Sequence, residues 1–223
     1  FIARQGGIVC GITLAQRVFY LLDQAISFAP LVEDGDTVHQ GLNIARISGP
    51  AHGILSGERL ALNFMQRLSG ISTLTAQCVG QVSHTRTRIT DTRKTTPGLR
   101  VLEKYAVRMG GAVNHRMSLS DGVLIKDNHI RAAGGIVNAV NAARKHAPHT
   151  LKIEVEAESI GQVIEALEAG ADIIMLDNMG LEEMHQAVQL CSTRALTEAS
   201  GNMDQRNLAE VAATGVDFIS IGA

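Results

Sequence analysis

The sequence contains no tryptophan, and aromatic residues account for only 3% of its 223 positions. This scarcity argues against a binder of single-stranded nucleic acid, because such proteins stack bases on aromatic side chains. No apolar run reaches the ~20 residues that a membrane-spanning helix requires. Residues 1–10 also lack the charged start and apolar centre of a signal peptide. We therefore expect contact with neither nucleic acid nor a membrane.

Cysteine usage and missing motifs exclude further classes of protein. Cys10, Cys78 and Cys191 are isolated, and none belongs to a CxxC pair. Three separated cysteines predict neither a disulfide framework nor a zinc site, and we expect a cytoplasmic protein. The motifs GxxxxGK(S/T), GxGxxG and HExxH are absent, which argues against an ATPase, a dinucleotide oxidoreductase and a zinc protease.

Positive charge is concentrated between Asp91 and His129. This segment carries seven Lys or Arg and four Asp or Glu, a net charge of +3, whereas the whole chain carries −2. A local cationic excess in an acidic chain favours a site for a multiply anionic small molecule over nucleic acid, whose binders spread charge over a whole face. The alternative is a solvated basic surface, but here the cations alternate irregularly with Gly, Pro, Asn and apolar residues.

The second half of the chain alternates between predicted strands and helices. The strands centre on Ile153, Ile174, Leu196 and Ile219, so they follow one another at 21 to 23 residues. Units of this length predict a parallel sheet with helical crossovers, which places the fold in the α/β class as a (β/α) barrel. Continuing the pattern backwards predicts earlier strands at 87–91, 111–115 and 123–126.

The first 57 residues follow a different pattern. Short β-like runs are interrupted by turn signals at Gly6-Gly7, Asp34-Gly35 and Gly49-Pro50. We predict a small separate domain over 1–57, a linking helix over 58–78 and the barrel over 79–223. The chain begins at Phe1 without Met and stops directly after a predicted strand, so we expect the natural protein to extend beyond both ends.

Polar or small residues follow the predicted strands of the barrel. Because the C-terminal ends of barrel strands form the active-site face, these residues are expected to converge on one rim. Glu156 and Asp177 end neighbouring strands and suit Mg²⁺, which takes one or two carboxylates plus substrate oxygens; the alternative is a pair of acids bonded to nearby cations. The rim residues are Arg93-Lys94, His115-Arg116, Lys126, Glu156, Asp177-Asn178, Glu198–Asn202 and Gly222-Ala223.

Other polar residues receive weaker interpretations. The small residues of segment 198–202 predict phosphate binding at a helix N-terminus, with a plain β-α turn as the alternative. Glu154 shares the face of Glu156 but lies one residue pair deeper, so Glu156 is preferred as the site residue. Lys104 and Arg108 fall on a predicted helix and are expected to be solvated. His129, His146 and His149 are expected to serve structure or surface.

Long segments of the sequence resemble nicotinate-nucleotide pyrophosphorylase (carboxylating), also called quinolinate phosphoribosyltransferase. The resemblance covers essentially the whole chain and implies an N-terminal α/β sandwich domain joined to an open (β/α) barrel, working as a homodimer. It implies a pentosyltransferase that moves phosphoribose from phosphoribosyl pyrophosphate to quinolinate with Mg²⁺. The products are nicotinate mononucleotide, pyrophosphate and CO₂, in de novo NAD biosynthesis. The matching segments are 58–73, 91–100, 104–121, 124–129, 153–159, 169–178, EASGN at 198–202 and TGVDFISIGA at 214–223.

The resemblance assigns roles to individual residues around quinolinate. Arg93, His115 and Arg116 resemble the binders of the quinolinate carboxylates. Arg59 resembles the arginine that the partner subunit contributes across the dimer interface. Ser118 stands where the family usually has Gly, a departure that we expect to leave catalysis intact.

The resemblance also assigns residues to phosphoribosyl pyrophosphate. Lys94 and Lys126 resemble the lysines that meet quinolinate and the pyrophosphate, and are expected to be catalytic. Glu156 and Asp177 resemble the acids that hold the ribose hydroxyls and Mg²⁺. The residues that resemble the 5′-phosphate cradle are Ser200, Gly201 and Gly222.

Two alternatives compete with this prediction. The first alternative is a protein of the same fold, either a phosphoribosyltransferase that uses nicotinate or another acid or a paralogue that serves metal uptake. The pair Arg93 and Arg116 argues against it, because two arginines favour a dicarboxylate substrate. A non-catalytic anion-binding protein is the second alternative, and the presence of both Glu156 and Asp177 argues against it.

Overall fold

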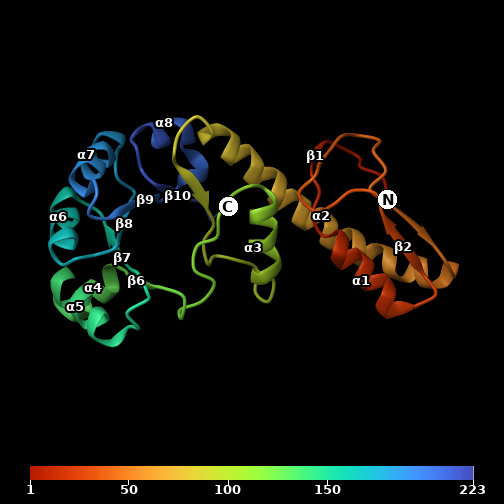
Figure 1. Ribbon diagram of the computed structural model, residues 1–223, viewed down its shortest axis with the longest axis horizontal. Coiled ribbons are helices and arrows are strands. Elements are labelled where there is room, and N and C mark those ends of the chain that lie inside the picture. The colour runs from red at the N-terminus through yellow and green to blue at the C-terminus, as the bar shows by residue number, and fades with distance from the viewer. Residues whose placement is uncertain (223) are drawn as a thin grey trace. The chain divides into compact units, whose positions relative to one another are not determined.

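The computed structural model describes residues 1–222, so Ala223, predicted at the rim, lies outside the described residues. The chain forms two compact units (Figure 1). One comprises residues 1–79 and 96–112, and the other comprises residues 80–95 and the chain from Val113 onward. None of the described helices combines the length and the apolar character needed to cross a membrane.

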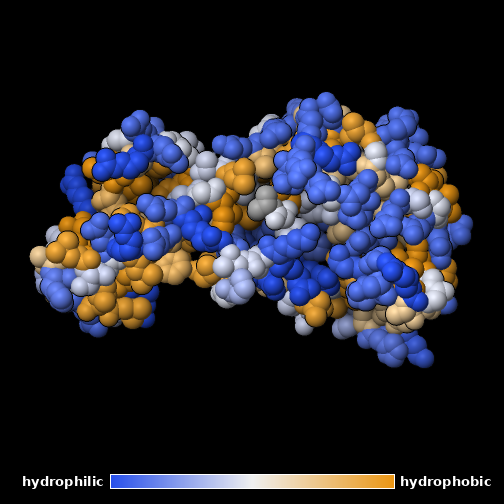
Figure 2. Space-filling view, turned by 180° about the vertical axis from the view of Figure 1, so that it is seen from behind, coloured by the Kyte–Doolittle hydropathy of each residue, from blue (hydrophilic) through white to orange (hydrophobic). Residues whose placement is uncertain are grey.

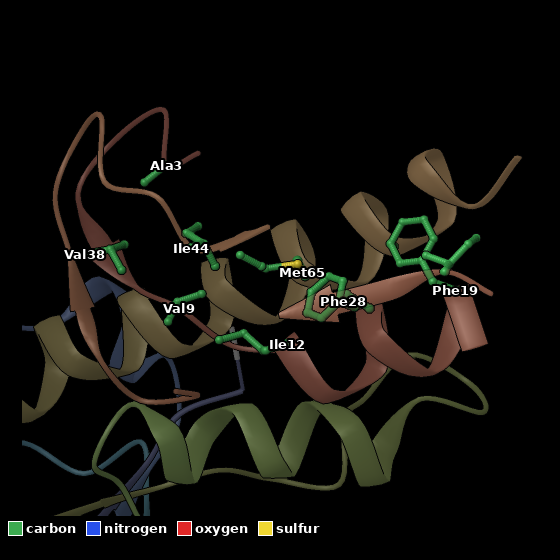
Figure 3. Close-up of a cluster of buried hydrophobic side chains, with 12 residues drawn as sticks. Ala3, Val9, Ile12, Phe19, Phe28, Val38, Ile44 and Met65 are labelled. Atoms are coloured by element: carbon green, nitrogen blue, oxygen red, sulfur yellow. The ribbon is translucent and has the colours of Figure 1, made fainter. Parts of the chain in front are cut away.

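The N-terminal unit contains two short antiparallel strand pairs, β1 with β3 and β2 with β4, and three helices. Its buried cluster includes Phe19, Phe28 and Met65 (Figure 3). The rings of Phe19 and Phe28 stack with centroids 5.9 Å apart. The elements are β1 (Gly7–Ile8), α1 (Ile12–Leu22), β2 (Ser27–Pro30), β3 (Thr37–Val38), β4 (Ala45–Ser48), α2 (Ala51–Val82) and α3 (Arg100–Met109).

The observed division differs from the predicted one in two respects. Helix α2 extends beyond the predicted range of 58–78 at both ends. Residues 96–112 belong to the N-terminal unit because α3 packs on α2, where Ser72 Oγ donates to the Ala106 carbonyl over 2.7 Å. The prediction that Lys104 is solvated is wrong, since the residue is only 1% exposed on α3.

The second unit is an open (β/α) barrel built on six parallel strands in the order β5-β10-β9-β8-β7-β6. In the described residues β6 pairs only with β7, and β5 has no partner strand besides β10 and is met on its other side by a single isolated bridge residue, so the sheet does not close on itself. The elements are β5 (Arg88–Thr90), β6 (Val123–Ile125), α4 (Asp127–Ala133), α5 (Ile136–His146), β7 (Ile153–Ala157), α6 (Ile160–Glu168), β8 (Ile173–Asp177), α7 (Leu181–Cys191), β9 (Leu196–Ser200), the 3₁₀ turn η1 (Met203–Gln205), α8 (Leu208–Ala213) and β10 (Phe218–Ser220).

The predicted strands of this unit are confirmed except for the one at 111–115. There only Val113 forms an isolated parallel bridge, with Thr90. The chain then leaves the sheet because the Asp91 carboxylate accepts hydrogen bonds from the Asn114 amide and the His115 backbone N–H. These side-chain contacts replace the backbone pairing that a longer strand would need.

The barrel sheet has one apolar and one polar face. Ile153, Val155 and Ile174 alternate on the face that the helices cover, and all three are fully buried. The parallel register aligns Glu156 with Met175 and Met175 with Glu198, so the carboxylates share the opposite face. Figure 1 shows α6 and α7 outside the strands, which leaves the polar face for a site.

Candidate active site

A cavity of about 360 Å³ lies at the C-terminal ends of the barrel strands. We call it the rim cavity. It is lined by every residue that the sequence predicted for phosphoribosyl pyrophosphate, although these residues lie on six separate stretches of chain. They are Lys94, Lys126, Glu156, Asp177, Ser200, Gly201 and Gly222.

Lys126 and Glu156 form an ion pair within the rim cavity. Lys126 directly follows β6 and Glu156 lies on β7, so the parallel pairing of these strands brings them together. Lys126 Nζ donates to Glu156 Oε2 over 2.8 Å, and the lysine side chain remains 47% exposed. The lysine is therefore held in place yet accessible to a ligand.

Asn178 organises the other side of the rim cavity. Its Nδ2 donates to Asp177 Oδ2 over 3.0 Å, and its Oδ1 accepts from Asn202 Nδ2 over 3.1 Å. Its backbone N–H donates to the Ser200 carbonyl, and its φ of 55° lies in the left-handed region, which Asn tolerates better than most residues. Asn178 thus connects Asp177 with the loop after β9.

A second cavity, of about 480 Å³, lies deeper on the polar face and is lined by His115, Arg116, Glu154 and Glu198. We call it the inner cavity. The His115 backbone N–H donates to Asp91 Oδ1 over 2.8 Å, and Arg116 Nη1 donates to the Gly122 carbonyl over 2.9 Å. The segment after Val113 is therefore fixed at both residues that the sequence predicted to bind carboxylates.

The charges around the inner cavity perturb one another. The hydrogen bond with Glu154 raises the pKa of His115, while burial opposes this change. Burial lowers the pKa of Arg116, and the charge of Arg93 lowers it further. Two guanidinium groups that are close enough to repel each other favour an anion between them.

The predicted site residues do not all line the two cavities. Arg93 lines neither, although its charge reaches Arg116. Arg59 is exposed on α2 in the N-terminal unit. Asp91 has defined contacts in the site but was not predicted to belong to it. Glu154 was set aside in favour of Glu156, and Glu198 and Asn178 were named only as parts of strand ends. The alternation of Glu154 with apolar neighbours was the one available signal for a shared face.

Two groups of side chains offer ligand atoms for a cation. Glu156 and Asp177 place carboxylates on neighbouring strands of the rim cavity, a donor set that fits Mg²⁺ together with substrate phosphates. His115, Glu154 and Glu198 place one ligand atom each within 4.8 Å of one another. The protons held by the second group decide whether it can bind a cation.

Comparisons with known proteins cover the whole chain. A family model for the quinolinate phosphoribosyl transferase C-terminal domain matches residues 71–223, and the N-terminal domain model matches residues 1–69. The whole chain is 47% identical to a probable nicotinate-nucleotide pyrophosphorylase (carboxylating) of Synechocystis sp. and covers 77% of that protein. It is also 42% identical over its whole length to quinolinate phosphoribosyltransferase (decarboxylating) 1 of Nicotiana glauca, of which it covers 68%. The crystal structure of NadC from Streptococcus pyogenes matches at a TM-score of 0.95 and 44% identity, over 99% of this chain and 78% of that one. The chain therefore belongs to the quinolinate phosphoribosyltransferase family.

Proposed function

We propose that the chain transfers a phosphoribosyl group from phosphoribosyl pyrophosphate to quinolinate. The products are nicotinate mononucleotide, pyrophosphate and CO₂, a step of de novo NAD biosynthesis. The observation that carries this function is the pair of cavities on one polar face. The rim cavity is lined by Lys94, Lys126, Glu156 and Asp177, and the inner cavity is lined by the cation Arg116. Relatives of closely similar sequence carry the same activity in their names.

The inner cavity is the proposed quinolinate site. Quinolinate is a dianion, and an arginine guanidinium binds a carboxylate through two parallel hydrogen bonds. Arg116 and Arg93 would meet its carboxylates, with His115 beside them. The hydrogen bonds of the His115 backbone N–H and of the Arg116 side chain support this role, because a site that is already ordered loses less entropy when it binds.

The rim cavity is the proposed site for phosphoribosyl pyrophosphate. Glu156 and Asp177 would hold the ribose hydroxyls and Mg²⁺, and the 5′-phosphate would lie against Ser200, Gly201 and Gly222. Gly222 supports this assignment because a Cβ there would lie 3.4 Å from Thr92 Oγ1. Both residues line the rim cavity, so a larger residue at position 222 would take up space in it. Bound Mg²⁺ supplies positive charge beside the leaving pyrophosphate.

The chemistry needs positioning and charge rather than a protein nucleophile. The quinolinate ring nitrogen forms a bond to C1 of the ribose while the bond from C1 to the pyrophosphate oxygen breaks. Lys126 and Lys94 would neutralise the departing pyrophosphate, and a carboxylate near C1 would stabilise the oxocarbenium-like centre. The cationic ring then accepts the electron pair of the adjacent C–CO₂⁻ bond, CO₂ leaves, and the carbon takes a proton.

A homodimer is the proposed assembly, with Arg59 completing the quinolinate site of the partner. Arg59 is exposed on α2, and the same helix carries Leu55 and Leu60, which are 71% and 50% exposed. Figure 2 shows apolar surface over the N-terminal unit, and exposed apolar patches mark interaction surfaces. We also propose a cytoplasmic location, where its three unpaired thiols remain reduced.

The test compares two acids as substrates. The chain is incubated with phosphoribosyl pyrophosphate, Mg²⁺ and either quinolinate or nicotinate, and mononucleotide formation is followed by ultraviolet absorbance. Product from quinolinate but not from nicotinate is the expected result, because nicotinate lacks one of the two carboxylates. Preferential use of nicotinate, or no product from either acid, would contradict the proposal.

A further inference from the structure

Two carboxylates and one imidazole form a buried cluster at the inner cavity. His115 Nε2 lies 3.1 Å from Glu154 Oε2 and 3.7 Å from Glu198 Oε1. Both glutamates are 4% exposed, and Oε1 of each has no hydrogen-bond partner within the described part of the chain. An ionised carboxylate is costly to bury without donors, so the position of the protons decides what this cluster does.

The tautomer of His115 follows from the contacts of its ring nitrogens. The backbone N–H of Arg116 donates to His115 Nδ1 over 2.8 Å, so Nδ1 acts as an acceptor and carries no proton. The ring proton then lies on Nε2, which faces Glu154. Protonating Nδ1 as well would require that nitrogen to lose its contact with the Arg116 amide.

The same tautomer argues against a metal ion in the cluster. A neutral imidazole that offers Nε2 to a metal carries its proton on Nδ1, where it needs an acceptor. Here Nδ1 of His115 faces a donor instead. Nε2 therefore presents a proton toward the two carboxylates rather than a lone pair.

Glu198 is a member of the cluster whose surroundings favour its protonated form. Burial raises the pKa of Glu198, and the charge of Glu154 raises it further. Even a protonated imidazole would balance only one of two buried negative charges, so the environment favours the protonated form of the second carboxyl group. The charged groups around the cluster include Asp91 and Arg93 after β5, Arg116 and Asp121 in the loop before β6, and Lys152 just before β7, which lines the same cavity.

We propose that Glu198 is a positioning residue whose proton controls the affinity for quinolinate, while Glu154 orients the His115 ring. This inference rests on the proposed function, because it takes the inner cavity as the quinolinate site. With Glu198 protonated, the cavity presents the positive charge of Arg116 to the dianion. When Glu198 ionises, a second carboxylate close to His115 repels that dianion. When Glu198 is ionised in the protein without quinolinate, it therefore takes up a proton as quinolinate binds.

Calorimetric titration of the full chain with quinolinate tests this directly. Titrations from about pH 6 to about pH 9, in buffers of different ionisation enthalpy, measure the protons taken up on binding. Both quinolinate carboxyl groups are ionised throughout this range, so the proton comes to the protein. We expect uptake that rises toward about one proton at the alkaline end, with affinity falling up to about tenfold per pH unit.

Two isosteric variants separate the roles of the glutamates. Glu198→Gln keeps the shape of the protonated acid but cannot ionise, so the proton uptake and the alkaline loss of affinity should both disappear. Glu154→Gln should keep the uptake and move it to lower pH, because the charge that opposes ionisation of Glu198 is gone. Thermal unfolding of each variant shows whether the fold persists.

The outcomes distinguish this inference from the proposed function. Quinolinate binding without proton uptake in the unsubstituted chain overturns the inference and leaves the function standing. Equal uptake in Glu198→Gln, or an altered unfolding temperature with an unchanged pH profile, also overturns it by indicating a purely structural role. Absence of quinolinate binding at every pH would remove the function and the inference together.

Discussion

A methyl group added to Gly201 would lie 2.3 Å from Asn178 Oδ1. Gly201 also has a φ of +92°, which residues with a Cβ rarely adopt. The Asn178 side chain accepts from Asn202 and donates to Asp177, so it cannot move away without breaking both hydrogen bonds. The loop after β9 thus requires glycine at this position for two separate reasons.

Gly201→Ala should therefore lower the free energy of unfolding more than a glycine substitution that causes backbone strain but no steric clash. Gly170 is the matched control, because its φ is +79° and a Cβ there would meet nothing within 4 Å. We expect Gly170→Ala to reduce the free energy of unfolding by about 1–2 kcal/mol, from backbone strain. Gly201→Ala should cost about 1–3 kcal/mol more, from overpacking, and should also raise the KM for phosphoribosyl pyrophosphate. Denaturant titration and steady-state kinetics measure both; equal effects of the two variants would contradict the contact with Asn178.

The proposed quinolinate site predicts the effect of removing its two arginines. Arg116→Ala and Arg93→Ala should each reduce kcat/KM for quinolinate by about 10²–10³, comparable to the loss of one preorganised donor. Arg86→Ala is the control, since the Arg86 side chain is 71% exposed, lines neither cavity, and contacts the Gly215 carbonyl over 3.2 Å and Asp217 at 3.8 Å. Near-normal kinetics with quinolinate in both Arg93 and Arg116 variants would place the dicarboxylate elsewhere.

The rim cavity predicts a change in metal dependence. Asp177→Asn keeps the side-chain shape but removes a charge that Mg²⁺ favours, so we expect a higher Mg²⁺ requirement and a higher KM for phosphoribosyl pyrophosphate. Quinolinate binding should be largely kept. Asp127→Asn is the control, because Asp127 pairs with Arg131 at the surface. If calorimetry instead found quinolinate binding lost and Mg²⁺ dependence unchanged, the assignment of Asp177 would be wrong.

The proposed dimer predicts complementation between two inactive variants. Arg59→Ala and Arg116→Ala should each be nearly inactive alone, because each removes one arginine from every site. After subunit exchange, about half of the dimers are heterodimers, and each of these has one site with both defects and one with neither. Recovery of up to about a quarter of the unsubstituted activity is expected. No recovery, with heterodimers confirmed by native mass spectrometry, would show that Arg59 does not act across the interface.

The sequence predicted those parts of the barrel that depend on local patterns. The alternation around Ile153 and the short apolar run at Ile174 reflect strands with one face against helices, and both strands lie where the pattern predicts them. Strand ends in a parallel sheet share one edge, so the pattern also predicted that Lys126 and Glu156 reach the same rim, where they form an ion pair.

Features that depend on tertiary contacts were beyond the sequence. Helix α3 belongs to the N-terminal unit because of its packing on α2, and nothing in its own periodicity identifies that partner. The sequence pattern assigns the buried Glu198 only to a phosphate loop, because its approach to His115 depends on sheet register and on the turn at Asp91. Such contacts join residues that are far apart in the chain, so a local sequence pattern does not predict them.

The most direct test of the proposed function is the fate of one carbon atom. Quinolinate labelled with ¹³C in the carboxylate next to the ring nitrogen is incubated with the chain, phosphoribosyl pyrophosphate and Mg²⁺, and gas and nucleotide are analysed by mass spectrometry. The proposed reaction predicts one labelled CO₂ for each pyrophosphate released, and unlabelled nicotinate mononucleotide. Label retained in the nucleotide, or pyrophosphate released without labelled CO₂, would contradict it.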